Sequence, residues 1–285
     1  MSEAVALTRE PVAFESRAWG AARISAVDLA LLSEVTGLPE DRCLARLAEY
    51  DPAEMAAAWR DWDPKSAEDV LAFYSETDLY LWELLAWNGS AAYEPYLRTL
   101  ARLTERWPPQ QHPRALDYGS GIGTAALALA ATGYRVTIAD VRGRTLEFAK
   151  ARLARRGIAF DVLEVAEGIP RLPPEGWDVL VCFDVLEHVP DAGRLGRALV
   201  GALVPGGGIA ITAAFDSAAE EWPHHVGATS GRFRGHRWWL HFQGLGTAKV
   251  GENLYRKLGR WPTLVRRAQY ALWRATGLRV EGLPR

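Results

Sequence analysis

Residues 116–124 read Leu116-Asp117-Tyr118-Gly119-Ser120-Gly121-Ile122-Gly123-Thr124. An acid ends a short apolar run, three glycines follow at alternate positions, and the small residues of 125–131 then favour a helix. Alternate glycines let the backbone turn tightly and let a ligand lie against it, as in the strand–loop–helix units that hold nucleotide-like cofactors. Asp117 would repel a pyrophosphate and attract a cationic amino group. The stretch therefore predicts a site for a positively charged cofactor.

Three further stretches support this prediction. Residues 134–140 form a strand-like run that ends in Asp140. An acid about 20 residues beyond a glycine loop can accept hydrogen bonds from a ribose diol. Residues 177–184 read as a buried strand, and residues 203–212 read as a helix end, a glycine turn and another strand. Such alternation of strands and helices predicts a parallel sheet covered on both faces.

This series of motifs resembles that of the class I S-adenosylmethionine-dependent methyltransferases, in their small-molecule or quinone-type branch. The resemblance covers about residues 112–258 and rests on Asp117-x-Gly119-x-Gly121-x-Gly123, Asp140, Asp184-Val185-Leu186-Glu187-His188-Val189 and Leu203-Val204-Pro205-Gly206-Gly207-Gly208. The glycine run alone is weakly specific, but the four motifs in this order are strongly specific. S-adenosylmethionine carries the amino group and sulfonium that Asp117 would attract.

A nicotinamide enzyme is the rival interpretation of the same loop. Gly121-x-Gly123-x-x-Ala126 fits the dinucleotide fingerprint in bare letters. Asp117 immediately before the loop argues against a pyrophosphate there, and so does the segment 184–188. We therefore expect S-adenosylmethionine as the cofactor.

The expected fold class is α/β, with a Rossmann-like seven-stranded, mostly parallel sheet, helices on both faces, a helical N-terminal segment and a basic C-terminal helix. Strands are expected near 114–118, 134–139, 159–164, 177–183 and 207–213. By resemblance, 247–250 and 253–256 form an antiparallel edge after a helix at 237–244. Helices are also expected at 26–32, 41–50, 52–62, 67–87 and 261–276.

Three parts of the chain are expected. Residues 1–110 form a helical cap or substrate region, residues 111–258 form the cofactor-binding core, and residues 259–285 form a basic amphipathic extension. A proline-rich linker at 107–113 separates the first two parts.

Length and composition agree with a globular protein. The 285 residues suffice for one large core with a smaller appendage. No apolar run reaches membrane-spanning length, and the N-terminus lacks the pattern of a secretory signal. Only two cysteines are present, Cys43 and Cys182, and they lie far apart in sequence. We therefore expect reduced thiols and a cytoplasmic location.

The net charge of −2 hides an asymmetry along the chain. Residues 222–285 hold twelve Lys/Arg and two Asp/Glu, so they carry about +10, whereas the remainder carries −12. The basic residues are interleaved with aromatic ones, among them Trp238, Trp239, Tyr255, Trp261, Tyr270 and Trp273. Such a region can bind nucleic acid or a membrane surface. It can equally dock against the acidic remainder or keep a helix soluble.

Ten residues are predicted to bind the cofactor by resemblance: Asp117, Tyr118, Gly119, Gly121, Gly123, Asp140, Val141, Ala166, Glu167 and Asp184. The glycine loop passes under the methionine part, and Asp117 contacts the amino group. Asp140 takes both ribose hydroxyls, or else caps a helix before Arg142. Val141 touches the adenine, and Asp184 lines the passage from cofactor to substrate.

Adenine recognition departs from the family pattern. In many relatives an acid followed by a small residue ends the third strand, and that acid meets the adenine amino group. Here the aligned position is Val165-Ala166. The contact therefore falls to Glu164, to Glu167 or to the backbone of Ala166.

The acceptor is expected in an enclosed pocket. Methyl transfer is an in-line displacement, in which the protein mainly aligns the nucleophile and excludes water. The aromatic run within residues 73–82 is predicted to cover the cofactor and to hold an aromatic or apolar acceptor through Tyr74, Tyr80 and Trp82. Ordinary helix packing against the core is the alternative for these side chains.

Histidines are the candidates for a general base. His224 and His225 follow the fifth strand of the core, and His188 follows the fourth. A metal site built from Glu220, Glu221, His224 and His225 is an alternative. No second ligand segment is apparent, however, and adjacent histidines usually point apart. We therefore expect no metal.

The sequence predicts an S-adenosylmethionine-dependent methyltransferase that acts on oxygen, nitrogen or carbon of a small molecule. One alternative is an RNA-modifying or a lipid or isoprenoid methyltransferase that uses the basic aromatic C-terminal region. No Asn-Pro-Pro-Tyr-like motif follows the fourth strand, which weakens an amino-methylating reaction on nucleic acid. Another alternative is a non-catalytic scaffold, against which the intact acids and glycines count. The acceptor and the oligomeric state are left open.

Overall fold

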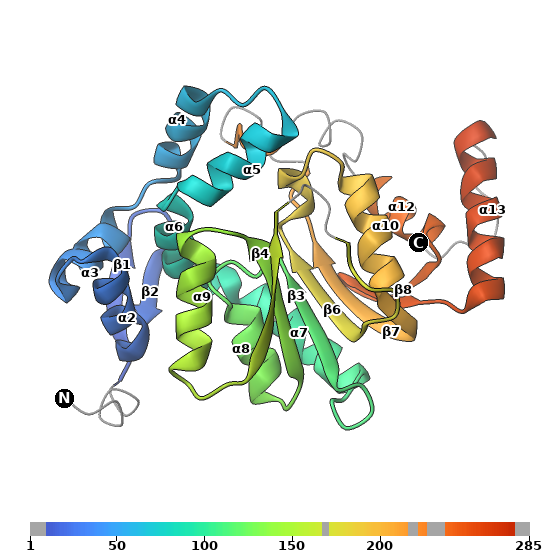
Figure 1. The fold of residues 1–285 in the computed structure, drawn as a ribbon, viewed down its shortest axis with the longest axis horizontal. Coiled ribbons are helices and arrows are strands. Elements are labelled where there is room, and N and C mark those ends of the chain that lie inside the picture. Colours follow the sequence, from blue (N-terminus) through green and yellow to red (C-terminus); the bar gives the residue numbers. More distant parts are fainter. Residues whose placement is uncertain (1–9, 167–170, 216–221, 227–236, 277–285) are drawn as a thin grey trace.

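The computed structural model describes residues 10–166, 171–215, 222–226 and 237–276. Its centre is a seven-stranded sheet in the order β5-β4-β3-β6-β7-β9-β8 (Figure 1). The strands are β3 (Arg114–Tyr118), β4 (Arg135–Val141), β5 (Phe160–Val165), β6 (Trp177–Phe183), β7 (Leu203–Thr212), β8 (Thr247–Gly251) and β9 (Leu254–Lys257). β3 to β7 pair in parallel, and β9 runs antiparallel to both β7 and β8. The predicted sheet is confirmed. Of its last two strands, only β9 runs antiparallel to the other six.

Strand β7 begins earlier than the glycine turn suggested. Trp177 pairs with Leu203, and Val179 pairs with Gly208. Residues 204–207 therefore form an irregularity inside β7. Gly206 has a φ of +85°, which favours glycine. A Cβ on Gly208 would lie 2.5 Å from the ring of Trp107. The glycines therefore serve close packing within a strand.

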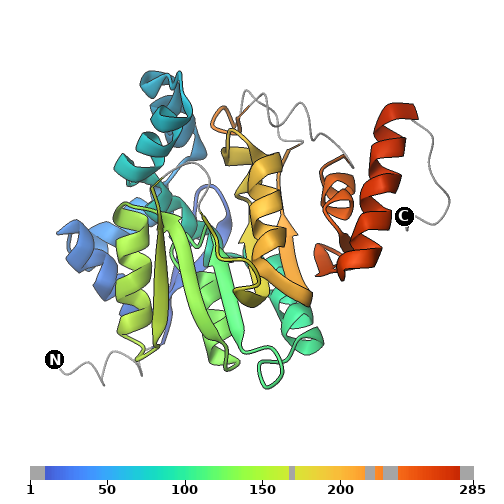
Figure 2. The same cartoon turned by 45° about the vertical axis from the view of Figure 1, so that its right-hand side comes forward.

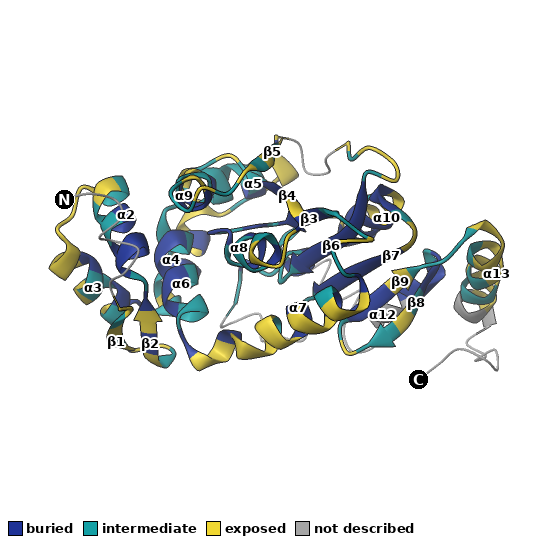
Figure 3. Cartoon of the chain, turned by 90° about the horizontal axis from the view of Figure 1, so that it is seen from below, coloured by how far each residue is buried: buried dark blue, intermediate teal, exposed yellow. Residues whose placement is uncertain are grey.

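The two faces of the sheet are covered by different helices. Side chains of α7 (Glu94–Arg106), α8 (Thr124–Ala131) and α9 (Arg144–Ala154) form one buried cluster with the sheet. Side chains of α10 (Ala192–Ala202) and α12 (Arg237–Gly244) form another with the opposite face. Alternate strand residues divide between these clusters, because successive side chains point to opposite faces. Figure 3 shows the strands as the most buried layer.

The expected linker at 107–113 is anchored to the sheet. Trp107 is buried in the same cluster as α7 and α8, and its indole donates a hydrogen bond to the Gly206 carbonyl (2.8 Å). Helix α7 therefore packs on the sheet, although the domain boundary expected at residue 110 leaves it with the cap.

The N-terminal segment is mainly helical and lies at one end of the sheet (Figure 1). It contains α2 (Ala26–Thr36), α3 (Glu40–Glu49), α4 (Pro52–Trp62), α5 (Ala67–Glu76), α6 (Leu79–Asn88) and the short η1 (Ala91–Tyr93). The prediction of helices alone is wrong for residues 12–24, where β1 (Val12–Ser16) and β2 (Gly20–Ile24) form an antiparallel hairpin. Burial alternates along both strands, which is the period of a strand and not of a helix.

Local sequence explains where these helices begin and end. Asp51 and Glu54 form the reciprocal capping box of α4, and Pro52 stands at its first position. The single helix expected over 67–87 is two helices. It breaks at 77–78, where the Thr77 hydroxyl accepts a hydrogen bond from the Leu79 amide (3.2 Å). This break lets α5 and α6 take different directions.

A buried ion pair joins the N-terminal segment to the core. Arg152 of α9 donates two hydrogen bonds to the Asp28 carboxylate of α2 (3.0 and 2.9 Å). Arg152 also donates to the Ile122 carbonyl (3.0 Å) and to the Thr124 hydroxyl (2.8 Å). Burial alone would raise the pKa of Asp28, but Arg152 and Arg156 outweigh it and lower that pKa. One guanidinium therefore connects the N-terminal helices to the end of the glycine loop.

The basic helix expected at the C-terminus is α13 (Arg260–Thr276), at the other end of the sheet (Figure 2). It packs on α12, where a Cβ on Gly244 would lie 2.5 Å from the Tyr270 ring. Trp261 is 76% exposed, and Leu264, Val265 and Leu272 are exposed as well. Among the described residues, no helix is both long enough and apolar enough to cross a membrane.

Candidate active site

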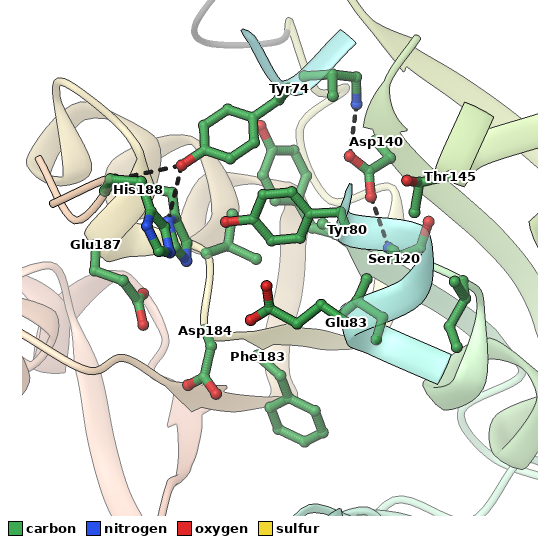
Figure 4. Close-up of a pocket in the computed structure, with 18 of the residues that line it drawn as sticks. Tyr74, Tyr80, Glu83, Ser120, Asp140, Thr145, Phe183, Asp184, Glu187 and His188 are labelled. Carbon is green, nitrogen blue, oxygen red and sulfur yellow. Dashed lines mark hydrogen bonds between the residues drawn. The ribbon is translucent and has the colours of Figure 1, made fainter. Parts of the chain in front are cut away.

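A cavity of about 440 Å³ opens at the carboxyl ends of β3, β4 and β6, which is where open α/β sheets bind ligands. Its walls come from the loops after these strands, from the turn at 222–225 and from α5 and α6. Figure 4 shows Asp140 and Ser120 on one side of this space and His188 and Glu187 on the other. The cavity therefore has a glycine-loop side and a histidine side.

Helix α5 is fixed over the loop after β4. The Ser75 hydroxyl donates a hydrogen bond to the Arg142 carbonyl. The next residue, Gly143, allows the close approach, because a Cβ there would lie 2.7 Å from the Ser75 carbonyl oxygen. The N-terminal helices are thus part of the cavity wall, as their aromatic residues predicted.

The glycine loop has the geometry that the sequence predicted. Gly119, Gly121 and Gly123 have φ values of +69°, +52° and +76°, in the region that favours glycine. The amides of Gly119 and Ser120 both donate to the Ala139 carbonyl (2.7 and 3.2 Å). A Cβ on Gly119 would lie 2.1 Å from Cγ2 of Val185. Gly119 and Gly121 line the cavity, whereas Gly123 precedes α8 as its N-cap residue.

The two predicted acids accept hydrogen bonds from backbone amides in and beside this loop. Asp117 accepts a hydrogen bond from the Ala126 amide (2.9 Å), and Asp140 accepts from the amides of Gly121 (2.6 Å) and Val141 (2.7 Å). Burial raises the pKa of Asp117 to about 7 and that of Asp140 to about 6. The alternative of Asp140 as a helix cap is wrong, because the N-cap residue of α9 is Gly143.

These raised pKa values predict a pH dependence of cofactor binding. Below about pH 6 to 7 the two carboxyls are partly protonated, and a cationic amino group binds the charged form of Asp117 better. Affinity for S-adenosylhomocysteine should therefore rise on the order of tenfold from about pH 5.5 to about pH 8. Calorimetry in buffers of different ionisation enthalpy would detect the released proton. The Asp117→Asn variant should flatten this profile, and an unchanged slope in it would contradict the assignment.

Of the other residues predicted to bind the cofactor, some line the cavity and others do not. Tyr118, Val141 and Asp184 line the cavity. At the end of β5 it is Val165 that lines the cavity, while Ala166 is exposed and absent from the described lining. Glu167 lies outside the described residues. An apolar side chain thus stands where many relatives have an acid.

Helix α6 presents one face to the cavity. Tyr80, Glu83, Leu84 and Trp87 line it, at the i, i+3, i+4 and i+7 spacing of a single helix face. Trp82 lies off that face, is buried in the N-terminal core and has the Arg46 guanidinium 5.7 Å from its ring centre. The prediction that Trp82 contacts the acceptor is therefore wrong, whereas Tyr74 and Tyr80 do line the cavity.

Glu83 is a site residue that the sequence reasoning missed. It accepts a hydrogen bond from the Tyr50 hydroxyl (2.7 Å), and burial raises its pKa to about 7. The sequence could have indicated Glu83, because it is the single charged residue of the mainly apolar α6. A lone acid in such a helix needs a partner or a function.

Three histidines meet on the far side of the cavity. His188 ends the short η2 (Leu186–His188), and His224 and His225 lie in a turn that the hydrogen bond from the His225 amide to the Trp222 carbonyl closes (3.0 Å). Ring centroids are 5.3 Å apart for His188 and His224, 4.7 Å for His188 and His225, and 5.0 Å for His224 and His225. The assumption that adjacent histidines point apart fails here. Glu220 and Glu221 lie outside the described residues.

Burial keeps the three imidazoles neutral. It lowers the pKa of His224 to about 3, that of His225 to about 4 and that of His188 well below its ordinary value. Tyr74 contacts this group, because its hydroxyl lies 2.9 Å from Nδ1 of His188 (Figure 4). At neutral pH each ring therefore keeps a lone pair on one nitrogen.

Two buried carboxyls lie beside the histidines. Asp184 accepts a hydrogen bond from the Tyr96 hydroxyl (2.5 Å) and has a φ of +50°. Glu187 accepts from the Ala214 amide through Oε1 (2.7 Å), and its Oε2 has no hydrogen-bond partner among the described residues. Burial raises the pKa of both, and the charge of Asp184 raises that of Glu187 further. Glu187 is a second site residue that the sequence reasoning did not select.

Comparisons with known proteins match the part of the chain that forms this site. A family model described as a methyltransferase domain matches residues 116–211. The ubiquinone biosynthesis O-methyltransferase of Stutzerimonas stutzeri is 30% identical over 126 residues, which cover 42% of this chain and 54% of that protein. The protein of the same description from Thiobacillus denitrificans is 32% identical, with the same coverage. The chain thus spans about half the length of the curated relatives it matches.

Among solved structures, an S-adenosylmethionine-dependent methyltransferase from Mesorhizobium loti is 27% identical. The similarity covers 43% of this chain and 53% of that one, with a TM-score of 0.37. The matched family segment runs from β3 to β7 and contains the glycine loop, Asp140 and the 184–189 segment. The chain therefore contains, over residues 116–211, a segment that matches a methyltransferase domain.

Proposed function

We propose that this protein binds S-adenosylmethionine in the cavity and transfers its methyl group to an oxygen of an uncharged small molecule. The observation that carries the proposal is the acidic composition of the cavity wall. Five carboxyls line it (Glu83, Asp117, Asp140, Asp184 and Glu187), and the described lining contains no lysine or arginine. A cationic cofactor suits this wall, whereas a phosphorylated or carboxylated acceptor would meet repulsion with no compensating partner.

The walls beyond the glycine loop favour an aromatic acceptor. Tyr74, Tyr80, Phe183 and Trp222 line the cavity there together with the histidines. Flat apolar rings bind well against aromatic faces and edges. Both named relatives are described as O-methyltransferases of ubiquinone biosynthesis, which supports oxygen as the acceptor atom.

The chemistry would follow from alignment and from exclusion of water. S-adenosylmethionine would supply a methyl group that its sulfonium already activates, and the cavity residues would align the acceptor oxygen with it and exclude water. The hydroxyl proton would leave to a base on the histidine side, where His188, His224 and His225 are unprotonated at neutral pH. Burial makes each of them a weaker base than a free imidazole, so alignment of the acceptor contributes more than proton transfer. Asp117 would hold the amino group and Asp140 the ribose, and both residues line the same cavity as the histidines.

Calorimetric titration with S-adenosylmethionine, S-adenosylhomocysteine and NADH tests the cofactor. We expect binding of the first two at micromolar concentrations and none of NADH. Transfer of a labelled methyl group would then be measured with phenols and catechols, each compared with its carboxylated or phosphorylated counterpart. Uncharged phenols should be methylated and their anionic counterparts should not. No binding of S-adenosylhomocysteine would refute the proposal and favour the scaffold alternative.

The alternatives that use the basic C-terminal region are not favoured. Neither named relative is described as acting on RNA. Helix α13 lies at the opposite end of the sheet from α5 and α6, which cover the cavity (Figure 1). Lipid action would require liposome binding that disappears on deletion of residues 261–285, and that deletion provides the test.

A further inference from the structure

We propose that His188, His224 and His225 form a binding site for one divalent transition-metal ion of the zinc type, with an open coordination position toward the cavity. One ligand atom from each histidine can be chosen so that all three lie within 4.8 Å of one another. A tetrahedral zinc ion with Zn–N bonds of about 2.0–2.1 Å holds its ligand nitrogens about 3.4 Å apart. Small rotations of the rings would therefore bring the three atoms to bonding distance.

Two buried imidazole nitrogens that lack hydrogen-bond partners support the binding of an ion at this cluster. Nδ1 of His224 and Nδ1 of His225 are buried and have no hydrogen-bond partner among the described residues. A buried nitrogen without a partner carries a cost in free energy, and two on one cluster call for a shared partner. Three neutral imidazoles suit zinc, copper, iron or nickel better than they suit magnesium or calcium, which prefer oxygen ligands.

The surroundings already orient two of the three rings. Nδ1 of His188 lies 2.9 Å from the Tyr74 hydroxyl, and the ring of His225 donates a hydrogen bond to the backbone of Ala214. Metal-binding histidines usually carry such a contact on the nitrogen that does not bind the ion, since it fixes the tautomer and the ring orientation. Figure 4 shows the hydroxyls of Tyr74 and Tyr80 directed toward His188.

Three protein ligands leave at least one position of a tetrahedral ion open, which is the arrangement of catalytic rather than structural zinc sites. Because all three histidines line the cavity, that position faces the space expected for the acceptor. Under the proposed function, on which this step rests, an acceptor hydroxyl would occupy the open position. Its oxygen would bond to the ion, and its proton would become more acidic. Because the ion would then hold the imidazole lone pairs, that proton would leave to a carboxyl of the cavity wall such as Asp184.

Titration of the full-length protein with Zn²⁺ alone and with Co²⁺ alone tests the site. We expect one ion per chain, bound at micromolar concentrations or more tightly, and a visible absorption band of tetrahedral Co²⁺. His188→Asn, His224→Asn and His225→Asn should each raise the Kd at least about tenfold, and Tyr74→Phe should raise it by about the same factor. His112→Asn is the matched control, because His112 precedes the amino end of β3, whereas the cavity opens at the carboxyl ends of the strands.

Absence of Zn²⁺ binding and of the Co²⁺ band in the unaltered protein would overturn the proposal, whether or not any variant folds. Unchanged affinity in a His188→Asn/His225→Asn double variant would overturn it as well, since the ion would then bind elsewhere. Titration with S-adenosylhomocysteine on the same samples separates the two hypotheses. Binding of the cofactor without the metal refutes only the metal site, and binding of the metal without the cofactor refutes only the proposed function.

Discussion

Replacing Asp140 with alanine should weaken binding of S-adenosylhomocysteine on the order of 100-fold. The carboxylate would accept two ribose hydroxyls, and hydrogen bonds to a charged group contribute about 1.5–3 kcal/mol each. Asp140 also holds the Gly121 amide at 2.6 Å, so its loss would loosen the glycine loop as well. Calorimetric titration measures the effect directly.

The matched control for this experiment is Asp161→Ala. Asp161 is an exposed acid on the neighbouring strand β5, so its removal changes the net charge equally without touching the cavity. Its affinity for S-adenosylhomocysteine should equal that of the unaltered protein. Equal affinity in the Asp140→Ala variant would mean that the ribose binds elsewhere, and the cofactor site would have to be reassigned.

Replacing Arg152 with alanine should lower the free energy of unfolding by about 3 kcal/mol, because Asp28 would lose one of its two guanidinium partners and keep Arg156 (2.9 Å). Asp28 and Arg152 side chains are only 4% and 11% exposed. The change should also weaken cofactor binding, since Arg152 supports the Ile122 carbonyl and the Thr124 hydroxyl beside the loop. Denaturant unfolding and calorimetry would measure the two effects separately.

Arg144→Ala is the control for Arg152→Ala. Arg144 lies on the same helix and also pairs with the N-terminal segment, through Asp78 (3.0 Å), but both side chains are nearly half exposed. Such a surface pair contributes about 0–1 kcal/mol. A similar loss of stability in both variants would show that the buried pair has no special role.

The pH dependence of the Arg152 effect has a definite sign. The folded-state pKa of Asp28 is lowered, so the ion pair contributes stability above the ordinary pKa of an aspartate. That contribution disappears as the pH falls through the lowered pKa and the carboxyl becomes protonated. The difference in unfolding free energy between the two proteins should therefore shrink in acid, below about pH 4.

Much of the fold could be predicted because its signals are local. The alternation of strands and helices, the Asp51–Pro52 helix start and the positive-φ glycines are all written within short stretches. The hairpin at 12–24 was missed although its alternation is equally local, because a helical interpretation of the whole segment overrode it. The break at 77–78 was missed although the polar run 75–78 separates the apolar residues of the two helices.

The candidate site was predicted unevenly for a physical reason. Asp117 and Asp140 sit at strand ends, where the chain direction alone places them beside the glycine loop. Trp82 and Glu83 are adjacent in sequence, and only the rotation of α6 against the core decides which of them reaches the cavity. A rotation of one residue on a helix moves a side chain by about 100°.

By itself the sequence determined the alternation of strands and helices, the glycine loop and the acids that support it, because backbone conformation and residue period are local properties. Tertiary structure alone decided that His188 meets His224 and His225, and that Arg152 reaches Asp28. Those contacts join segments far apart in the chain. They depend on how whole helices and loops pack, and no short-range pattern encodes that packing.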